Sequence, residues 1–240
     1  MEDVVIGIDL GTQGVRSLAV RADGELAAEA QVRLPAAPSG LPAGWSEQDP
    51  REWRRALMAC LRGLTAQLTA GTRVAGICVD STSGTVLPVD AAGDPLHYAL
   101  MYDDRRSEAQ VEVVRSAGSD LQVKLGYVFA SSYALPKLFW FKQERPEVFT
   151  RAARFLHAAD YLAGCLSGDF TQSDTSNALK TGYDLIELRW PDFIGADLGI
   201  QADKLPQVIL PGETMGTVSR QAAEESGLAA GTPVYAGATD

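Results

Sequence analysis

Apolar and polar positions near the start of the chain predict strands joined by tight turns. An apolar run covers Val4–Leu10, and a second run from Arg16 to Val20 follows a glycine-containing turn. Asp23-Gly24 is a typical hairpin turn, so it joins Ser17–Arg21 to a third strand at Leu26–Leu34. The chain is therefore predicted to open with a three-stranded meander.

A helix is predicted after the proline- and glycine-rich loop 34–44. Asp49 can accept hydrogen bonds from the free N–H groups at its start, Pro50 suits the first turn, and Glu52 stands at the capping-box position. Apolar residues then recur at helical spacing and predict one buried stripe, made of Trp53, Leu57, Cys60, Leu61, Leu64 and Leu68.

The rest of the chain mixes strands and helices. The strands are predicted at Val74–Val79, Thr85–Val89 and Val234–Ala236, with strand and turn over 168–188. The helices are predicted near Arg105–Ser116, Leu135–Glu144 and Ala158–Leu166, and from Ser219 to Gly227. This order favours an α/β fold, a mixed sheet flanked by helices in about three layers. Doubly wound nucleotide folds alternate strand and helix from the start, and the chain has neither a Gly-x-Gly-x-x-Gly segment nor a Gly-Lys-Ser/Thr phosphate loop.

Composition narrows the function. The 240 residues are 46% hydrophobic and 22% charged, as in ordinary globular proteins, and the formal net charge of −10 argues against a nucleic-acid surface. The sequence has no apolar stretch of membrane-spanning length and no signal peptide, so a cytoplasmic protein is expected. Three widely separated cysteines, Cys60, Cys78 and Cys165, are expected to be reduced thiols.

The first candidate for chemistry is the segment from Gly7 to Gly14. Its glycines let the backbone approach an anion, and the turn N–H groups with the Thr12 hydroxyl can hold phosphate oxygens. Asp9 would repel a phosphate unless a cation such as Mg²⁺ lay between them. The alternative interpretation is a plain hairpin with a capping aspartate.

This segment resembles the first phosphate motif of the actin–hexokinase superfamily, whose domains have a ribonuclease H-like fold. Further segments narrow the resemblance to the FGGY family of carbohydrate kinases, in the family's order and over essentially the whole chain. These segments are Gly44–Pro50 with Trp53, Leu135–Trp140 with Arg145–Phe149, Asp160–Leu162, Ser173–Ala178, and Gly227–Val234 leading into Gly237–Asp240. The resemblance implies a sugar-binding N-terminal domain over residues 1–240, with the family's C-terminal nucleotide-binding domain absent from this chain.

The resemblance also implies roles for individual residues. Asp240 stands where the family has its catalytic aspartate, and a carboxylate there would accept the proton of a sugar hydroxyl during transfer of the γ-phosphoryl group of ATP. Gly11, Thr12 and Gln13 would hold the ATP phosphates, and Asp9 would hold Mg²⁺. The alternative interpretation of Asp240 is an aspartate that only ends a strand.

The expected sugar site departs from that of xylulose kinases. Thr82 and Ser83 stand where those enzymes carry a Met-His pair, and two hydroxyls can donate to and accept from sugar hydroxyls. Asp104 is expected to accept from a sugar hydroxyl, with Asp103 as its neighbour. The alternatives are that Thr82 and Ser83 only close a turn, and that Asp104 caps the following helix.

Together these features predict ATP-dependent phosphorylation of a ketopentose, D-ribulose or D-xylulose, with Asp9, Thr12, Ser83, Asp104 and Asp240 around one cleft. The expected partners are a sugar and ATP, with no nucleic acid and no membrane, and a homodimer is allowed. This chain alone is expected to be inactive. The alternatives are a non-catalytic sugar sensor, a kinase for another ketose or polyol, and another superfamily member such as a phosphatase or an acyl-metabolism ATPase.

Overall fold

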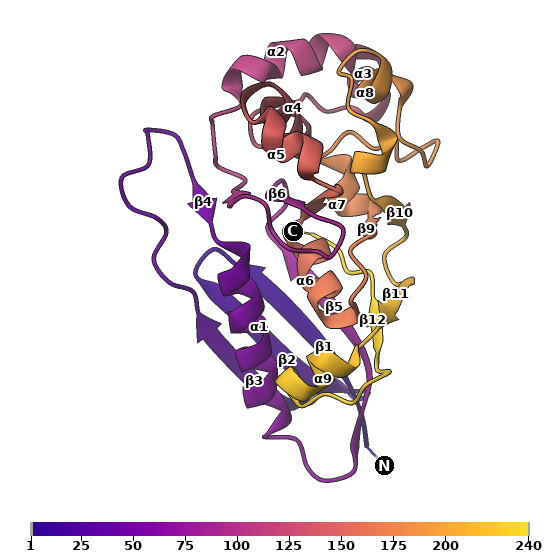
Figure 1. Cartoon of the computed structure of the whole chain (residues 1–240). Helices are drawn as coiled ribbons and strands as arrows, with labels where there is room; N and C mark the ends of the chain where they lie inside the picture. The colour runs from indigo at the N-terminus through magenta and orange to yellow at the C-terminus, as the bar shows by residue number, and fades with distance from the viewer. Residues whose placement is uncertain (1, 240) are drawn as a thin grey trace.

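A six-stranded mixed sheet carries most of the N-terminal half in the computed structural model, which describes residues 2–239 (Figure 1). The strand order is β11-β12-β5-β1-β2-β3; β1, β5 and β12 run parallel, and the other neighbours are antiparallel. The strands are β1 (Glu2–Gly11), β2 (Gly14–Arg21), β3 (Leu26–Arg33), β5 (Thr72–Ser81), β11 (Thr214–Thr217) and β12 (Pro233–Tyr235).

The predicted meander is confirmed. Val4, Ile6, Ile8 and Leu10 alternate with more exposed residues along β1, so one face of the strand enters the core. At the β2–β3 turn, the Asp23 carboxylate accepts a 3.0 Å hydrogen bond from the backbone N–H of Glu25, as expected for a tight hairpin.

Helices α1 (Pro50–Thr65), α6 (Ala158–Ser167) and α9 (Arg220–Ser226) cover one face of this sheet and contact each other (Figure 1). Helix α1 begins where predicted, and Asp49 accepts a 3.0 Å hydrogen bond from the N–H of Arg51. Glu52 pairs with Arg55 instead of completing the predicted capping box. The helix ends at Thr65, so Leu68 packs on the core from outside it.

The opposite face of the large sheet exposes apolar side chains: Val5 is 54% exposed, Leu18 36% and Leu26 48%. Val5 and Leu18 alternate with the core positions of their strands, so they point away from α1, α6 and α9. Leu26 shares their face because the β2–β3 register shifts beside it and pairs it with Val20. Within residues 2–239, helices therefore cover one face of this sheet, and the predicted third layer is wrong for it. The mixed α/β character is confirmed.

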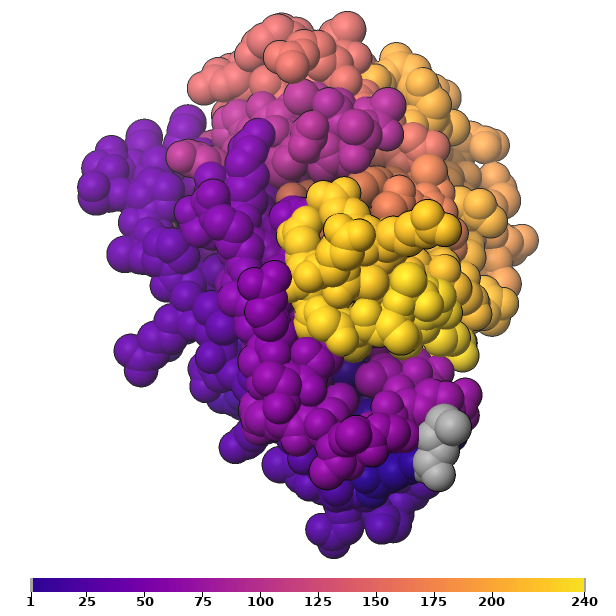
Figure 2. Space-filling view, turned by 60° about the horizontal axis from the view of Figure 1, so that its bottom comes forward, coloured from indigo at the N-terminus to yellow at the C-terminus, as the bar shows by residue number. Residues whose placement is uncertain are grey.

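A smaller antiparallel sheet with the order β4-β7-β6-β8 supports a second, mainly helical region (Figure 1). Its strands are β4 (Glu47–Gln48), β6 (Val86–Val89), β7 (Ala99–Leu100) and β8 (Arg154–His157). The helices there are α2 (Glu108–Ala117), α3 (Ser119–Leu125), α4 (Ala134–Glu144), α5 (Pro146–Arg151), α7 (Thr175–Leu179), α8 (Asp192–Ala196) and the 3₁₀ turn η1 (Ala202–Lys204). Strands β9 (Gln172–Asp174) and β10 (Gln207–Ile209) pair in parallel. Figure 2 shows the C-terminal segment, in yellow, between the purple N-terminal half and the orange part of this region.

Two differences from the sequence predictions have local causes. The helix predicted from Arg105 begins at Glu108, because the backbone N–H of Arg106 is bound to the Asp104 side chain in a loop. The segment 168–188 contains α7, which begins at Thr175. Asp174 caps this helix, because its carboxylate accepts hydrogen bonds from the N–H groups of Ser176 and Asn177. None of the helices within residues 2–239 combines the length and apolar character that a membrane crossing needs.

Candidate active site

The parallel strands of the large sheet bring several candidate residues to one edge. In the register of β1 and β5, Asp9 is opposite Asp80 and Leu10 is opposite Ser81. Thr239 forms a parallel bridge with Ser81, and its hydroxyl donates a 2.7 Å hydrogen bond to the Ser81 carbonyl. Because the carboxyl ends of parallel strands meet at one edge, Asp9 and Thr239 both lie beside the end of β5. Asp240 lies outside the described residues.

The predicted phosphate turn connects β1 and β2. Thr12 and Gln13 are exposed there, while their carbonyls are held by Gln48 Nε2 at 2.8 Å and by the N–H of Leu34 at 2.9 Å. Gly14 is needed for close packing, since a Cβ at this position would lie 2.6 Å from the Val32 carbonyl oxygen. The turn is therefore fixed through its carbonyls and presents two exposed side chains.

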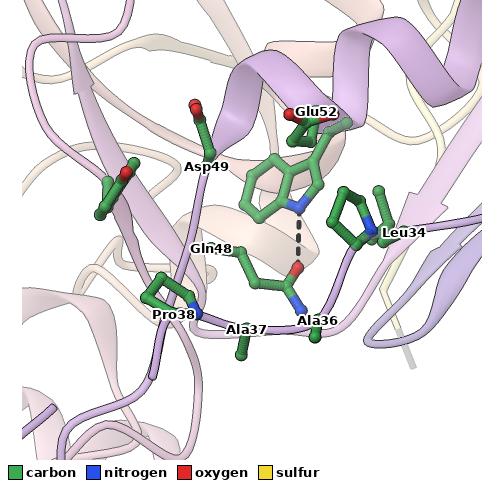
Figure 3. Close-up of a pocket in the computed structure, with 10 residues that line it drawn as sticks. Leu34, Ala36, Ala37, Pro38, Gln48, Asp49 and Glu52 are labelled. Carbon is green, nitrogen blue, oxygen red and sulfur yellow. Dashed lines mark hydrogen bonds between the residues drawn. The ribbon is translucent and has the colours of Figure 1, made fainter. Parts of the chain in front are cut away.

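Gln48 also belongs to a pocket of about 270 Å³ beside this turn (Figure 3). Its side-chain oxygen accepts a 2.7 Å hydrogen bond from Trp53 Nε1, shown as the dashed line in Figure 3. The lining combines the loop 34–38 with the start of α1 and Tyr98. Asp9 and the predicted sugar residues are not part of this lining, so we assign the candidate site to the strand ends instead.

The loop between β5 and β6 carries Thr82 and Ser83, both half-buried. Gly84 has φ +77°, and a Cβ there would lie 2.1 Å from the Ser132 carbonyl oxygen, so this turn requires glycine. The buried hydroxyl of Thr85 lies 3.4 Å from the Thr82 hydroxyl and accepts a 3.1 Å hydrogen bond from the N–H of Tyr102. The predicted sugar loop is thus joined to the loop that holds Asp103 and Asp104.

The two neighbouring aspartates have different surroundings. Asp103 is exposed, whereas Asp104 is buried, with its oxygens accepting hydrogen bonds from the Ser46 N–H at 2.7 Å and from the Arg106 guanidinium at 2.7–3.0 Å. Arg106 also pairs with Glu47 at 2.6 Å and lies 3.8 Å over the Trp45 ring. Asp104 therefore fixes this loop, and its contact with a sugar stays a prediction. The alternative helix-cap interpretation is wrong, because Ser107 is the N-cap of α2.

Lys137, on α4, is a residue that our sequence reasoning missed. Its side chain is completely buried, and its ammonium donates to the carbonyls of Gly84, Tyr102 and Ser132 at 2.9, 3.4 and 3.4 Å. Burial lowers the pKa of Lys137 to about 7, against the attraction of the Asp104 and Asp103 carboxylates. A lysine within the apolar segment 134–141 was the available signal.

His157 at the end of β8 is buried, with Nε2 2.9 Å from the Thr181 hydroxyl. Burial lowers the pKa of His157 to about 4, so the imidazole is neutral near pH 7. Among residues 2–239, no group of three or more His, Cys, Asp or Glu side chains is placed to bind a metal.

Comparison with known proteins agrees with the fold. The family model "FGGY family of carbohydrate kinases, N-terminal domain" matches residues 4–240. Xylulose kinase of Bacillus subtilis (strain 168) is 28% identical over 238 residues, which are 98% of this chain and 47% of that protein. Autoinducer-2 kinase of Yersinia pseudotuberculosis serotype O:3 is 31% identical over 245 residues, which are 99% of this chain and 46% of that protein.

A solved xylulose kinase from Rhodospirillum rubrum has a TM-score of 0.90 and 28% identity, covering 99% of this chain and 49% of that one. The chain thus spans about half the length of the relatives it matches. The match of the N-terminal family model to nearly every residue establishes the relationship: the chain belongs to the FGGY family of carbohydrate kinases.

Proposed function

We propose that this chain is the sugar-binding part of an ATP-dependent carbohydrate kinase that phosphorylates a ketopentose. One observation carries the proposal: Asp9, the loop of Thr82 and Ser83, and Thr239 lie at the same carboxyl edge of the parallel strands. Thr239 immediately precedes Asp240 in the sequence, and its hydroxyl is hydrogen-bonded to the Ser81 carbonyl, so the segment that leads to the proposed general base adjoins the sugar loop.

The proposed chemistry assigns one task to each part of the edge. The attacking sugar oxygen forms a bond to the γ-phosphorus, the bond from that phosphorus to the ADP oxygen breaks, and ADP leaves with the electron pair. Asp240 accepts the proton of the sugar hydroxyl. Gly11, Thr12 and Gln13 face the ATP phosphates in this arrangement, with the exposed side chains of Thr12 and Gln13 available to them.

Asp9 fits a magnesium ligand by its chemistry. It is an exposed carboxylate at the strand end, opposite Asp80, and Mg²⁺ commonly binds through one or two carboxylates together with substrate phosphates. The ion would neutralise phosphate charge during transfer. A metal site of this kind is completed by the nucleotide, so it does not require three protein ligands.

A ketopentose is the proposed substrate, with D-ribulose ahead of D-xylulose. The hydroxyls of Thr82 and Ser83 and the exposed Asp103 supply donors and acceptors for sugar hydroxyls. The xylulose kinases among the relatives favour a sugar of this size. We place the protein in the cytoplasm as part of this proposal, because ATP is available there.

The test is ADP release by the full-length polypeptide that carries this chain, with D-ribulose, D-xylulose, D-glucose or glycerol as acceptor. We expect the two ketopentoses to give the highest kcat/KM and to raise the Tm most, since a ligand stabilises the state that binds it. Glucose or glycerol equalling the ketopentoses would contradict the substrate. Sugar binding with no ADP release would favour the non-catalytic sensor.

A further inference from the structure

We propose that Lys137 is a positioning residue of the sugar site: its ammonium joins the loop of Thr82 and Ser83 to the loop of Asp103, and so sets the spacing between them. The proposal rests on the proposed function for the identity of the site. Lys137 itself lies behind these loops and is not placed to touch a substrate, because its side chain is completely buried.

The geometry accounts for every proton of the ammonium. A lysine ammonium has three N–H donors, and Nζ of Lys137 has three carbonyl acceptors, on Gly84, Tyr102 and Ser132. The three carbonyls belong to separate segments: the β5–β6 loop, the β7–α2 loop, and the loop before α4. One side chain therefore holds three segments that are distant in sequence.

Two of these carbonyls adjoin predicted sugar residues. Gly84 follows Ser83, and Tyr102 precedes Asp103. A shift of either carbonyl would therefore move a neighbouring sugar-binding group. The loops are also in close contact, since the Ser132 carbonyl lies 2.1 Å from the position of a Cβ on Gly84. The carbonyls converge there, and a positive charge between them offsets the repulsion of their oxygens.

The burial of Lys137 argues against a role in packing alone. Burying a charged group is unfavourable unless polar partners compensate, and an apolar side chain of similar length would fill the same space but leave the three carbonyls without their donor. Lys142, on the same helix, provides a contrast. It is half-buried and donates a 2.6 Å hydrogen bond to the Leu198 carbonyl, away from both loops.

Charged groups around Lys137 come from several elements. The carboxylates of Asp103 and Asp104 favour its protonated form, whereas Arg106 and Lys180 disfavour it. His157 also interacts with the Lys137 charge. Burial lowers the pKa of Lys137 to about 7, so the third N–H donor is lost as the pH rises through neutrality. The loops should therefore be held more firmly at pH 6 than at pH 8.

The test compares Lys137→Met, which keeps the length of the side chain and removes its donors, with Lys142→Met as the matched control. Hydrogen exchange of residues 82–85 and 101–104 is measured without sugar at pH 6 and pH 8, corrected for intrinsic exchange rates, and the Kd for D-ribulose is measured by calorimetry. We expect Lys137→Met to exchange at least about tenfold faster in both loops and to bind about tenfold more weakly. The wild type should lose loop protection from pH 6 to pH 8, and Lys137→Met should not.

Wild-type protection and Kd in a folded Lys137→Met protein would overturn the proposal, as would equal effects of Lys142→Met. If Lys137→Met does not fold, Lys137→Gln replaces it, with two N–H donors and an expected intermediate exchange rate; wild-type exchange in that variant would equally overturn the proposal. The exchange arm needs no ligand. Faster loop exchange in a protein that binds no sugar would therefore contradict the proposed function while supporting the role of Lys137 in holding the loops.

Discussion

The hydroxyl of Thr239 donates a 2.7 Å hydrogen bond to the carbonyl of Ser81, 158 residues earlier in the chain. This bond fixes the segment before Asp240 to the strand that leads into Thr82 and Ser83. Gly237 makes the approach possible, since a Cβ there would lie 2.1 Å from the Val79 carbonyl oxygen. In the sequence, the predicted general base Asp240 directly follows Thr239, and the predicted sugar loop directly follows Ser81, so the two begin at paired positions.

Replacing Thr239 with valine removes this donor while keeping the branched shape. We expect turnover with D-ribulose to fall on the order of fivefold, the effect of one hydrogen bond of ordinary strength. Thr232→Val is the control, because Thr232 donates a similar 2.8 Å bond to the Ala229 carbonyl. Steady-state kinetics in the full-length protein measure this turnover. Equal losses of turnover in Thr239→Val and Thr232→Val would contradict a role of the Thr239 bond in the active site.

Gly84→Ala, compared with Gly24→Ala, distinguishes backbone strain at positive φ from a steric clash of the new Cβ with the sugar loop's surroundings. Gly84 and Gly24 both have positive φ, +77° and +90°, but only Gly84 has a carbonyl in the space that a Cβ would fill. We expect Gly84→Ala to lose roughly 1–3 kcal/mol more unfolding free energy than Gly24→Ala, and to weaken sugar binding. Urea unfolding and calorimetry measure both quantities. Unchanged sugar affinity in Gly84→Ala would argue against a site at this loop.

Much of the large sheet could be predicted from the sequence because its cause is local. Alternation along Val4–Leu10 and the Asp23-Gly24 turn are properties of neighbouring residues, and so is the capping of α1 by Asp49. The burial of Asp104 could not be predicted in the same way. It depends on the N–H of Ser46, 58 residues away, and on Arg106, which pairs with Glu47 and lies over the Trp45 ring.

The contacts of Lys137 could not be predicted from the neighbouring sequence either. The sequence predicted its helix, but its three carbonyl partners come from loops whose approach depends on the whole fold. The uncovered face of the large sheet was not predicted either. Alternation identifies which side chains share a face, whereas the presence of a covering helix depends on where distant segments pack.

Acid should destabilise the protein through His157. Because burial lowers the pKa of His157 to about 4, the unfolded chain binds a proton near pH 6.5 that the folded protein does not bind until about pH 4. Stability is therefore lost as the pH falls through this window, by about 2 kcal/mol between pH 7 and pH 5 relative to His157→Gln. Parallel stability profiles for wild type and His157→Gln would contradict this origin.

Asp9→Asn keeps the shape of the side chain and removes the charge proposed to bind Mg²⁺. In the full-length protein we expect magnesium-dependent turnover to fall at least about a hundredfold while the Kd for sugar changes less than about twofold. Asp23→Asn, in the β2–β3 turn at the opposite end of the sheet, should leave both unchanged. A collapse of sugar affinity in Asp9→Asn would instead place Asp9 in the sugar site.

The kinetics of Asp240→Asn test the central claim most directly. The amide keeps the size of the side chain but cannot accept the sugar proton, so kcat for ADP release with D-ribulose in the full-length protein should fall roughly 10²–10⁴-fold. The Kd for sugar should rise only a few-fold, because an amide still forms hydrogen bonds with sugar hydroxyls. That result is expected if Asp240 is the general base of a sugar kinase. A kcat near the wild-type value would contradict it.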